Sequence, residues 1–312
     1  MNAILFPGQG SQVVGMGSEF YNNFDLVKNI FKEADEKLGY KISQIILEGP
    51  SDKLTLTQNT QPAILTVSYS IFSVLKKEFE FNFNSTKFFA GHSLGEYTAL
   101  VCSSSLKFSD ALFLLYERGK SMQEAVPIGK GSMIAVLGTK IDEINKFIQE
   151  TKSKGVCEIA NDNAEGQIII SGDVVSIDVL KKILTNNKKK FIPLNVSAPF
   201  HCSLMREAAN KMKAKINSVD FKKPDYGIIS NVTSKTESDP ETIKKLLIEQ
   251  IYSTVRWRES LINMSKEKIT QFIEIGPGKV LSGMAKRTIK DINCFSINSI
   301  DDMKKTIDEF KK

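Results

Sequence analysis

The chain has 312 residues, of which 41% are hydrophobic and 25% are charged, so it is long enough to fold into one or two soluble domains. Its net charge of +6 is not gathered into the basic stripe of a nucleic-acid-binding module, and no stretch reaches the ~20 apolar residues of a membrane helix. Two histidines and four cysteines without a CxxC pair provide no ligand cluster for zinc, and buried free thiols are expected at Cys102, Cys157, Cys202 and Cys294.

The N-terminal residues are predicted to form a strand. Residues 3–6 are apolar and end at Pro7, and no basic segment precedes them as it would in a signal peptide. The sequence therefore predicts a cytoplasmic location of the bacterial type, while an organellar location stays open.

Helices and strands alternate in the first part of the chain. Residues 17–39 have helical periodicity that ends at a glycine. Residues 60–79 predict a core helix with Pro62 in its first turn, where a proline is favoured. Residues 87–90 predict a strand, and a further helix follows from Glu96 onward.

The middle of the chain, residues 126–197, has a different order of elements. Strands and helices are predicted in the order βαββαβ, with a tight turn at "AEGQ" between the second and third strands. This order is that of the ferredoxin-like unit. We therefore predict a small domain at residues 126–197, inserted into a larger discontinuous domain that comprises residues 1–125 and 198–312.

Further short apolar segments follow the insertion. Strands are predicted within residues 226–233, 271–278 and 292–299, with helical segments around them and a charged helix at the end. Strands that alternate with helices predict an α/β fold with an open, mostly parallel sheet covered by helices.

The segment "GHSLG" between the strand at residues 87–90 and the helix from Glu96 fits the G-x-S-x-G pattern of a nucleophile elbow. On such a turn Ser93 projects from the carboxyl edge of the sheet, and the backbone N–H of Leu94 points to the same place. The helix N-terminus would favour an oxyanion there. A plain helix cap is the alternative for this serine, but the strand-turn-helix setting favours a nucleophile on an α/β-hydrolase-like domain.

A nucleophilic serine needs a base, and only two histidines are available. His92 is adjacent to Ser93 and is expected to be a hydrogen-bonded packing residue. His201 follows a predicted strand, which is where catalytic groups gather in α/β sheets, so it is the candidate base. No clear acid lies between Ser93 and His201, because Asp162 and Asp173 are expected in turns. A carbonyl group could orient the imidazole instead.

Two other segments carry candidate site residues. The glycine-rich "PGQGSQ" after the first strand does not fit a nucleotide-binding loop, but it could donate a second N–H to an oxyanion. Arg118 lies near the end of an apolar helix, and Met122 lies one turn further on the same face. The arginine either pairs with a neighbouring carboxylate or binds the carboxylate of a substrate.

Six segments together resemble one family, the malonyl-CoA:acyl carrier protein transacylases of fatty-acid and polyketide synthesis. They are "FPGQGSQ", "GHSLGEY", "YERGKSMQ", "SAPFHCSLM", "NVT" and "IEQIYSTVRW", in this order and over nearly the whole chain. The resemblance implies that Ser93 carries the malonyl group as an ester and that His201 is its base. It also implies that the main-chain carbonyl of Gln250 orients this histidine, which accounts for the missing acid.

The resemblance extends to the residues around the acyl group. It implies that the backbone N–H groups of Gln9 and Leu94 form the oxyanion hole, and that Arg118 binds the malonyl carboxylate. Residues expected to line the acyl pocket or to bind the acyl group are Met122, Asn231 and Phe200. The bulk of the phenylalanine would disfavour a branched acyl group such as methylmalonyl.

The implied reaction is a ping-pong transfer of malonyl from malonyl-CoA to the phosphopantetheine thiol of acyl carrier protein, which supplies fatty-acid elongation. No metal or bound cofactor is implied, and a monomer is expected. Acyl carrier proteins are acidic, so the net positive charge suits this partner. Two alternatives are a serine hydrolase that acts on a small acyl ester and a non-catalytic scaffold with an acyltransferase fold.

Overall fold

The computed structural model describes residues 1–196 and 198–311. The larger of its two sheets has the strand order β10-β9-β1-β2-β7-β8. Its strands are β1 (Asn2–Phe6), β2 (Thr86–Gly91), β7 (Gly227–Ile229), β8 (Thr236–Glu237), β9 (Gln271–Ile275) and β10 (Asn293–Ile297). All neighbouring pairs are parallel except β7 with β8, so the predicted mostly parallel sheet is confirmed.

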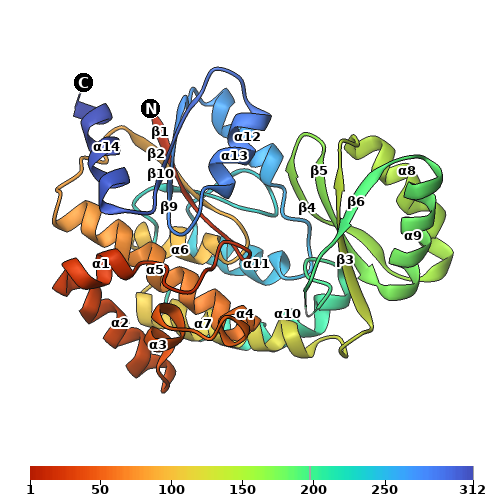
Figure 1. Ribbon diagram of the computed structural model, residues 1–312, viewed down its shortest axis with the longest axis horizontal. Coiled ribbons are helices and arrows are strands. Elements are labelled where there is room, and N and C mark those ends of the chain that lie inside the picture. Colours follow the sequence, from red (N-terminus) through yellow and green to blue (C-terminus); the bar gives the residue numbers. More distant parts are fainter. Residues whose placement is uncertain (197, 312) are drawn as a thin grey trace.

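Helices cover both faces of this sheet (Figure 1). The central strand β1 is fully buried, and its side chains alternate between two cores. Ile4 and Phe6 belong to the core shared with α5 (Thr57–Lys77), α6 (Gly95–Cys102) and α7 (Phe108–Glu124). Ala3 and Leu5 belong to the core shared with α12 (Trp257–Lys266) and α13 (Val280–Thr288).

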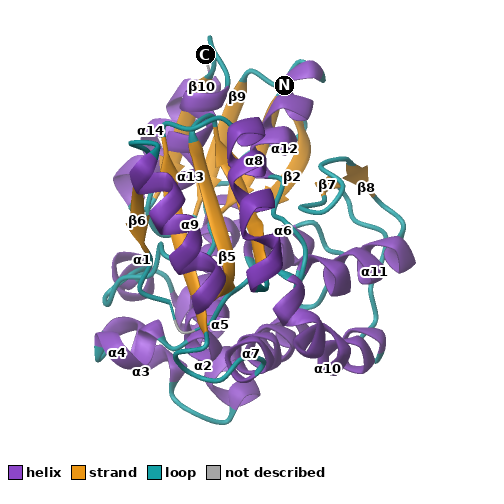
Figure 2. Ribbon diagram, turned by 90° about the vertical axis from the view of Figure 1, so that its right-hand side faces the viewer, coloured by secondary structure: helices purple, strands orange, loops and turns teal. Residues whose placement is uncertain are grey.

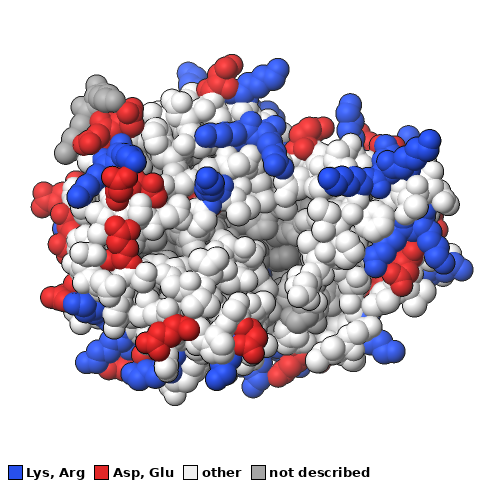
Figure 3. All heavy atoms as spheres, viewed as in Figure 1, with Lys and Arg blue, Asp and Glu red and all other residues white. Residues whose placement is uncertain are grey.

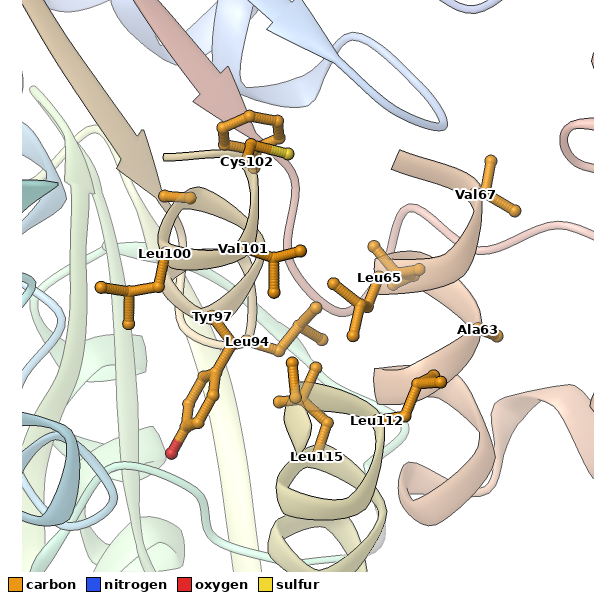
Figure 4. Close-up of a cluster of buried hydrophobic side chains, with 14 of the residues drawn as sticks. Ala63, Leu65, Val67, Leu94, Tyr97, Leu100, Val101, Cys102, Leu112 and Leu115 are labelled. Atoms are coloured by element: carbon orange, nitrogen blue, oxygen red, sulfur yellow. The ribbon is translucent and has the colours of Figure 1, made fainter. Parts of the chain in front are cut away.

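The helix that follows the predicted elbow, α6, is buried along its whole length. Tyr97, Leu100 and Val101 on this helix lie among side chains of α5 and α7, such as Leu65 and Leu115 (Figure 4). A helix that is apolar on all sides needs such cover, and burial of each large side chain contributes about 1.5–3 kcal/mol. The elbow at the start of α6 therefore rests on a rigid element.

The remaining helices pack around the larger sheet and its two helical layers. Their bounds are α1 (Ser18–Asn23), α2 (Asp25–Leu38), α3 (Ile42–Leu47), α4 (Ser51–Thr55), α10 (Arg206–Asn217), α11 (Pro240–Gln250) and α14 (Ile300–Lys311). A short 3₁₀ turn at Ser203–Met205 precedes α10, and another at Lys152–Lys154 belongs to the middle of the chain. None of the helices in the described part of the chain is long and apolar enough to span a membrane.

The middle of the chain forms the second sheet, with the strand order β4-β5-β3-β6. Its elements are β3 (Gly131–Leu137), α8 (Ile141–Thr151), β4 (Cys157–Ala164), β5 (Gln167–Asp173), α9 (Val174–Asn186) and β6 (Lys190–Pro193). All strand pairs are antiparallel. The order βαββαβ with this strand arrangement is ferredoxin-like, as predicted.

The two faces of this smaller sheet have different neighbours. Figure 2 shows α8 and α9 lying across one face, where Ile134 and Ile170 pack against them. Met133 and Ile169, each one residue away along its strand, point to the other face and join the core of the larger unit. Because side chains alternate between the two faces of a strand, one face of the smaller sheet packs against its own helices and the other against the larger unit.

The two units meet along β4. Asp162 lies within this strand and not in a turn. Its backbone N–H donates to the carbonyl of Val255. Its buried carboxylate pairs with Arg258 of α12 at 2.9 Å. The expectation that Asp162 is a turn residue is therefore wrong, because a β-strand places it at the seam between the units.

Asp173 ends β5 and caps the N-terminus of α9, with its side chain accepting from the N–H of Ser176.

The predicted domain boundaries at residues 125, 126 and 198 stay a prediction. The boundary residue 197 and the C-terminal residue 312 lie outside the described residues.

Two helix predictions need correction. Pro62 is not in the first turn, because α5 begins at Thr57 and the proline lies inside it. The helix tolerates it since burial of almost every α5 side chain outweighs one missing backbone hydrogen bond. The periodic segment 17–39 forms two helices, because Phe24 between α1 and α2 has an extended backbone.

The cysteines are free, as predicted, but not all of them are buried. Cys294 is half-buried because it lies on β10, which is an edge strand of the larger sheet.

Candidate active site

The turn between β2 and α6 has the backbone of a nucleophile elbow. Ser93 has a φ of 54°, in the left-handed region that a non-glycine residue seldom adopts. A Cβ on Gly91 would overlap the carbonyl of Gly95, and a Cβ on Gly95 would overlap the carbonyl of Phe6. Only glycine fits at these two positions, and the turn is tight enough to expose the serine side chain.

His201 lies beside the serine, as predicted. The Oγ of Ser93 and the Nε2 of His201 are 2.8 Å apart, and the Nδ1 of His201 lies 2.9 Å from the main-chain carbonyl of Gln250. A carbonyl can only accept, so Nδ1 carries the proton and Nε2 is free to accept the serine proton. The carbonyl takes the place that an acid has in a full triad.

Burial and the nearby guanidinium of Arg118 lower the pKa of His201 to about 3. Burial also lowers the pKa of His92. The imidazole of His201 is therefore neutral at pH 7, which is the form that a general base requires.

Arg118 is buried at 1% exposure and points from α7 into the same site. Its Nη1 donates to the Oε1 of Gln61 at 2.8 Å, and its Nη2 donates to the Oε1 of Gln250 at 2.8 Å and to the Oγ of Ser93 at 3.1 Å. The guanidinium is thus held by two amide oxygens within reach of the nucleophile.

No carboxylate among the described residues forms an ion pair with Arg118. The neighbouring Glu117 pairs with Lys215 instead. The amide of Gln250 bonds both Arg118 and Glu96, and the charge of Glu96 acts to raise the pKa of Arg118 while burial lowers it. A buried cation without a direct ion pair is still costly, because neutral amide oxygens replace only part of its hydration. Of the two alternatives for this arginine, an ion pair with a neighbouring carboxylate is not observed among the described residues.

A cavity of about 250 Å³ opens above these residues, between the two units. Its polar end is formed by Ser93, His201, Arg118 and Gln61. The other walls are mainly apolar and include Met122, Met133, Ile169, Leu194, Val196, Phe200, Leu281 and Met284. On the face shown in Figure 3, charged side chains lie mostly around the rim and the middle is uncharged. The cavity suits a ligand with one charged end and an otherwise apolar contact surface.

The two residues predicted to form the oxyanion hole lie on either side of the serine turn. Gln9 lines the cavity from the loop after β1, whereas Leu94, which directly follows the serine at the start of α6, is not among the described lining residues. Neither N–H group has an acceptor among the described residues. Unpaired amides beside a nucleophile are the arrangement of an oxyanion hole.

The predicted pocket residues differ in their placement. Met122 and Phe200 line the cavity, whereas Asn231 is not among the described lining residues. The Oδ1 of Asn231 accepts from the N–H of Ser93 at 2.7 Å, and its Nδ2 donates to the carbonyl of Gly91 at 2.7 Å. This corrects the expectation for Asn231, which supports the strained elbow from behind.

His92 is a hydrogen-bonded packing residue, as expected, although it also lines the cavity and so does not point wholly away from the reacting side. Its Nε2 lies 2.8 Å from the Oδ1 of Asn163, and its ring packs edge-on against Trp257. Within the described chain, no cluster of three or more histidine, cysteine or acidic side chains could hold a metal ion.

Three residues of the site were missed by the sequence analysis. Gln61 holds Arg118, Asn163 holds His92, and Glu96 accepts hydrogen bonds behind the elbow. A charged residue within a helix that is otherwise uncharged and buried was a usable signal for Glu96. Gln61 follows four polar residues at the start of α5 and carried no such signal. Asn163 carried no such signal, because strand β4 reaches the site only in three dimensions.

Fold and site together define an acyl transferase. The model of the acyl transferase domain matches residues 4–312, and the chain belongs to this family.

Particular members of the family are similar over nearly the full length. The malonyl CoA-acyl carrier protein transacylase of Bacillus subtilis (strain 168) is 41% identical, with 99% of this chain and 97% of that protein covered. The crystal structure of the acyl-carrier-protein-S-malonyltransferase from Bartonella henselae matches with a TM-score of 0.96 and 39% identity, covering 100% and 99% of the two chains. A malonyl-transacylase in complex with its type II PKS acyl-carrier protein has a TM-score of 0.95 and 35% identity, covering 99% of each chain.

Proposed function

We propose that this enzyme transfers the malonyl group of malonyl-CoA to the phosphopantetheine thiol of acyl carrier protein, through a malonyl ester on Ser93. The observation that carries the proposal is the buried guanidinium of Arg118, which has no carboxylate partner among the described residues and lies 3.1 Å from the serine oxygen. The similar proteins named above support the same substrate and carrier.

The first half of the reaction acylates Ser93. His201 takes the proton from the serine hydroxyl at Nε2 while Oγ attacks the thioester carbonyl of malonyl-CoA. The N–H groups of Leu94 and Gln9 bind the negative oxygen of the tetrahedral intermediate. One such donor is worth about 2.7–4 kcal/mol. The intermediate then breaks its C–S bond, and His201 returns the proton to the departing thiolate of CoA.

The second half repeats these steps with a different thiol. The thiol of the carrier loses its proton to His201 and attacks the carbonyl of the malonyl ester. The C–O bond to Ser93 breaks, and the serine oxygen takes the proton back from the histidine. The free enzyme is regenerated, and the product is malonyl-acyl carrier protein.

Arg118 is proposed to bind the carboxylate of the acyl group with two parallel hydrogen bonds. This contact places the carbonyl carbon near Ser93 and favours malonyl over acetyl. The bulk of Phe200 at the cavity wall is proposed to disfavour a methyl branch on the acyl group.

The net charge of +6 complements an acidic carrier protein. A monomeric state and a cytoplasmic location, both predicted from the sequence, belong to the same proposal.

Mass spectrometry of the intact protein tests the function. After mixing with malonyl-CoA, we expect an adduct of one malonyl group on the wild type and none on Ser93→Ala. Addition of holo-acyl carrier protein is expected to remove the adduct and to yield malonyl-carrier. A wild type that forms no adduct refutes the transfer, and an adduct lost to water as fast as to the carrier indicates a hydrolase.

A further inference from the structure

Glu96 is a buried carboxylate that the proposed reaction does not use. It lies in the first turn of α6, three residues after Ser93, and is 3% exposed. None of the described lysine or arginine side chains forms an ion pair with it. Its Oε2 accepts from the Nε2 of Gln250 at 2.7 Å and from the N–H of Asn231 at 3.1 Å. Burial of an unpaired carboxylate is costly, so its contacts need an explanation.

The partner of this carboxylate, Gln250, contacts three residues of the proposed site. Its main-chain carbonyl accepts from His201, and its side-chain Oε1 accepts from Arg118 at 2.8 Å. Its Nε2 donates to the carbonyl of Ser93 at 3.0 Å as well as to Glu96. Gln250 is fully buried, so its side-chain amide depends on protein groups for its hydrogen bonds.

An amide side chain can adopt two orientations that differ by a half-turn, which exchanges its oxygen and its nitrogen. In the reversed orientation the NH₂ group of Gln250 would face the guanidinium of Arg118, and two donors would meet. The Oε2 of Glu96 also accepts from the N–H of Asn231, which can only donate, so this oxygen faces Gln250 as an acceptor. With Glu96 on its other side, the NH₂ group must face Glu96, and the oxygen must face Arg118.

We infer that Glu96 is a positioning residue for the acyl transfer: it orients the side-chain amide of Gln250, whose oxygen then holds the guanidinium of Arg118 toward the acyl carboxylate. This inference rests on the proposed function, because it gives Glu96 a role in the recognition of a carboxylated acyl group. The effect travels from Glu96 through Gln250 to Arg118, and Glu96 itself touches no reacting atom.

A merely structural role is the competing explanation. A carboxylate in the first turn of a helix interacts favourably with the helix dipole, and the bond to the N–H of Asn231 supports the elbow. Loss of that support would slow the acylation of Ser93 by any acyl group. Loss of the orientation of Gln250 would slow acylation by malonyl in particular.

The test compares rates of serine acylation by malonyl-CoA and acetyl-CoA. Glu96→Met fills a similar volume without an acceptor. We expect it to lower the malonyl rate about 10- to 100-fold and the acetyl rate less than about 3-fold, the range expected for a lost hydrogen bond to a charged group. In Glu96→Gln the amide oxygen can take the place of Oε2, and both rates are expected to stay within about 3-fold of the wild type. An equal fall in both rates, or no fall, refutes the inference.

A second variant tests the inference even if Glu96→Met does not fold. Gln250→Met keeps the main-chain carbonyl that faces His201 and removes only the amide, so it should lower the malonyl-to-acetyl ratio as Glu96→Met does. In the double variant, the second change should alter this ratio by less than about 2-fold, because both act through one amide. An unchanged ratio in Gln250→Met refutes the inference. A wild type that does not load malonyl refutes the proposed function instead.

Discussion

At the scale of single residues, the site combines groups whose charges are set by burial. His201 is kept neutral because its pKa is lowered to about 3, first by burial and then by Arg118. As the pH falls, this base stays unprotonated below the ordinary histidine pKa of about 6.5. Burial raises the pKa of Glu96 to about 7, although hydrogen bonds from Gln250 and Asn231 act in the opposite direction. One positive group, Arg118, therefore dominates the cavity floor.

Arg118→Ala tests the selectivity that this charge creates. We expect acylation of Ser93 by malonyl-CoA to slow about 100-fold, since the substrate carboxylate loses its partner in a buried site. Acylation by acetyl-CoA is expected to stay unchanged or to rise.

Arg118→Lys serves as the matched control. It keeps the charge but cannot form two parallel bonds, so its malonyl rate should lie between those of wild type and Arg118→Ala. The rates are measured by mass spectrometry of the acyl-enzyme. A malonyl rate that survives in Arg118→Ala without a gain in relative acetyl rate would remove the arginine from substrate recognition.

At the scale of elements, the β2–α6 turn requires glycine at two positions, Gly91 and Gly95, because a side chain at either would overlap backbone atoms. The strand and the helix approach so closely that Gly91 and Gly95 have backbone atoms where a Cβ would stand. The amide of Asn231 then holds the strained Ser93 from behind. The strain at the nucleophile is sustained because α6 is buried on every side.

Gly91→Ala is expected to lower the free energy of unfolding by at least about 2 kcal/mol, because the new methyl group displaces backbone. A shift of the serine by about 1 Å would also slow acylation roughly 100-fold. Gly283→Ala on α13 is the matched control. No atom lies within 4 Å of its Cβ position, so the helix should gain about 0.5–1 kcal/mol.

Urea denaturation gives both free energies, and acyl-enzyme formation gives the rate. Equal stabilities of the two alanine variants would contradict the packing at the elbow.

At the scale of the whole molecule, the site lies at the seam between two units. The larger unit supplies Ser93, Arg118 and Gln250, while the smaller sheet supplies one wall of the cavity through Met133 and Ile169. Strand β4 joins them, through the contact with Val255 and the ion pair between Asp162 and Arg258. The cavity keeps its shape only while the two units stay together.

Asp162→Ala removes the buried partner of this ion pair and leaves a guanidinium of which 20% remains exposed. We expect a loss of about 2 kcal/mol in the free energy of unfolding, less than for a fully buried pair. Malonyl-CoA should also bind more weakly, because the neighbouring Asn161 and Asn163 line the cavity.

Asp178→Ala is the control for this variant, since its pair with Lys181 lies on the surface with 53% of the aspartate exposed. It should change the stability by less than about 0.5 kcal/mol. Urea denaturation and the KM for malonyl-CoA measure the two effects. If both variants behave alike, the ion pair at the seam has no role in holding the units together.

Features that depend on neighbours along the chain could be predicted from the sequence. The elbow at Ser93 shows in its glycine spacing, and the ferredoxin-like order of residues 126–197 shows in its hydrophobic periods. His201 could be found because the chain has only one other histidine. In each case a local pattern determines the local backbone.

Features that depend on the convergence of distant segments were decided by the tertiary structure. The partners of Arg118 come from α5, the elbow and α11, and no local pattern places Gln61 or Gln250 beside it. Asn231 supports the elbow where a pocket residue was expected, and Pro62 lies within a helix whose burial outweighs its local preference. By itself the sequence determined the serine turn, the histidine beside it and the order of most elements. Only the packing of the helices on the sheet decided which buried polar groups meet, because an unpaired polar group in a dry interior must find its partner across the fold.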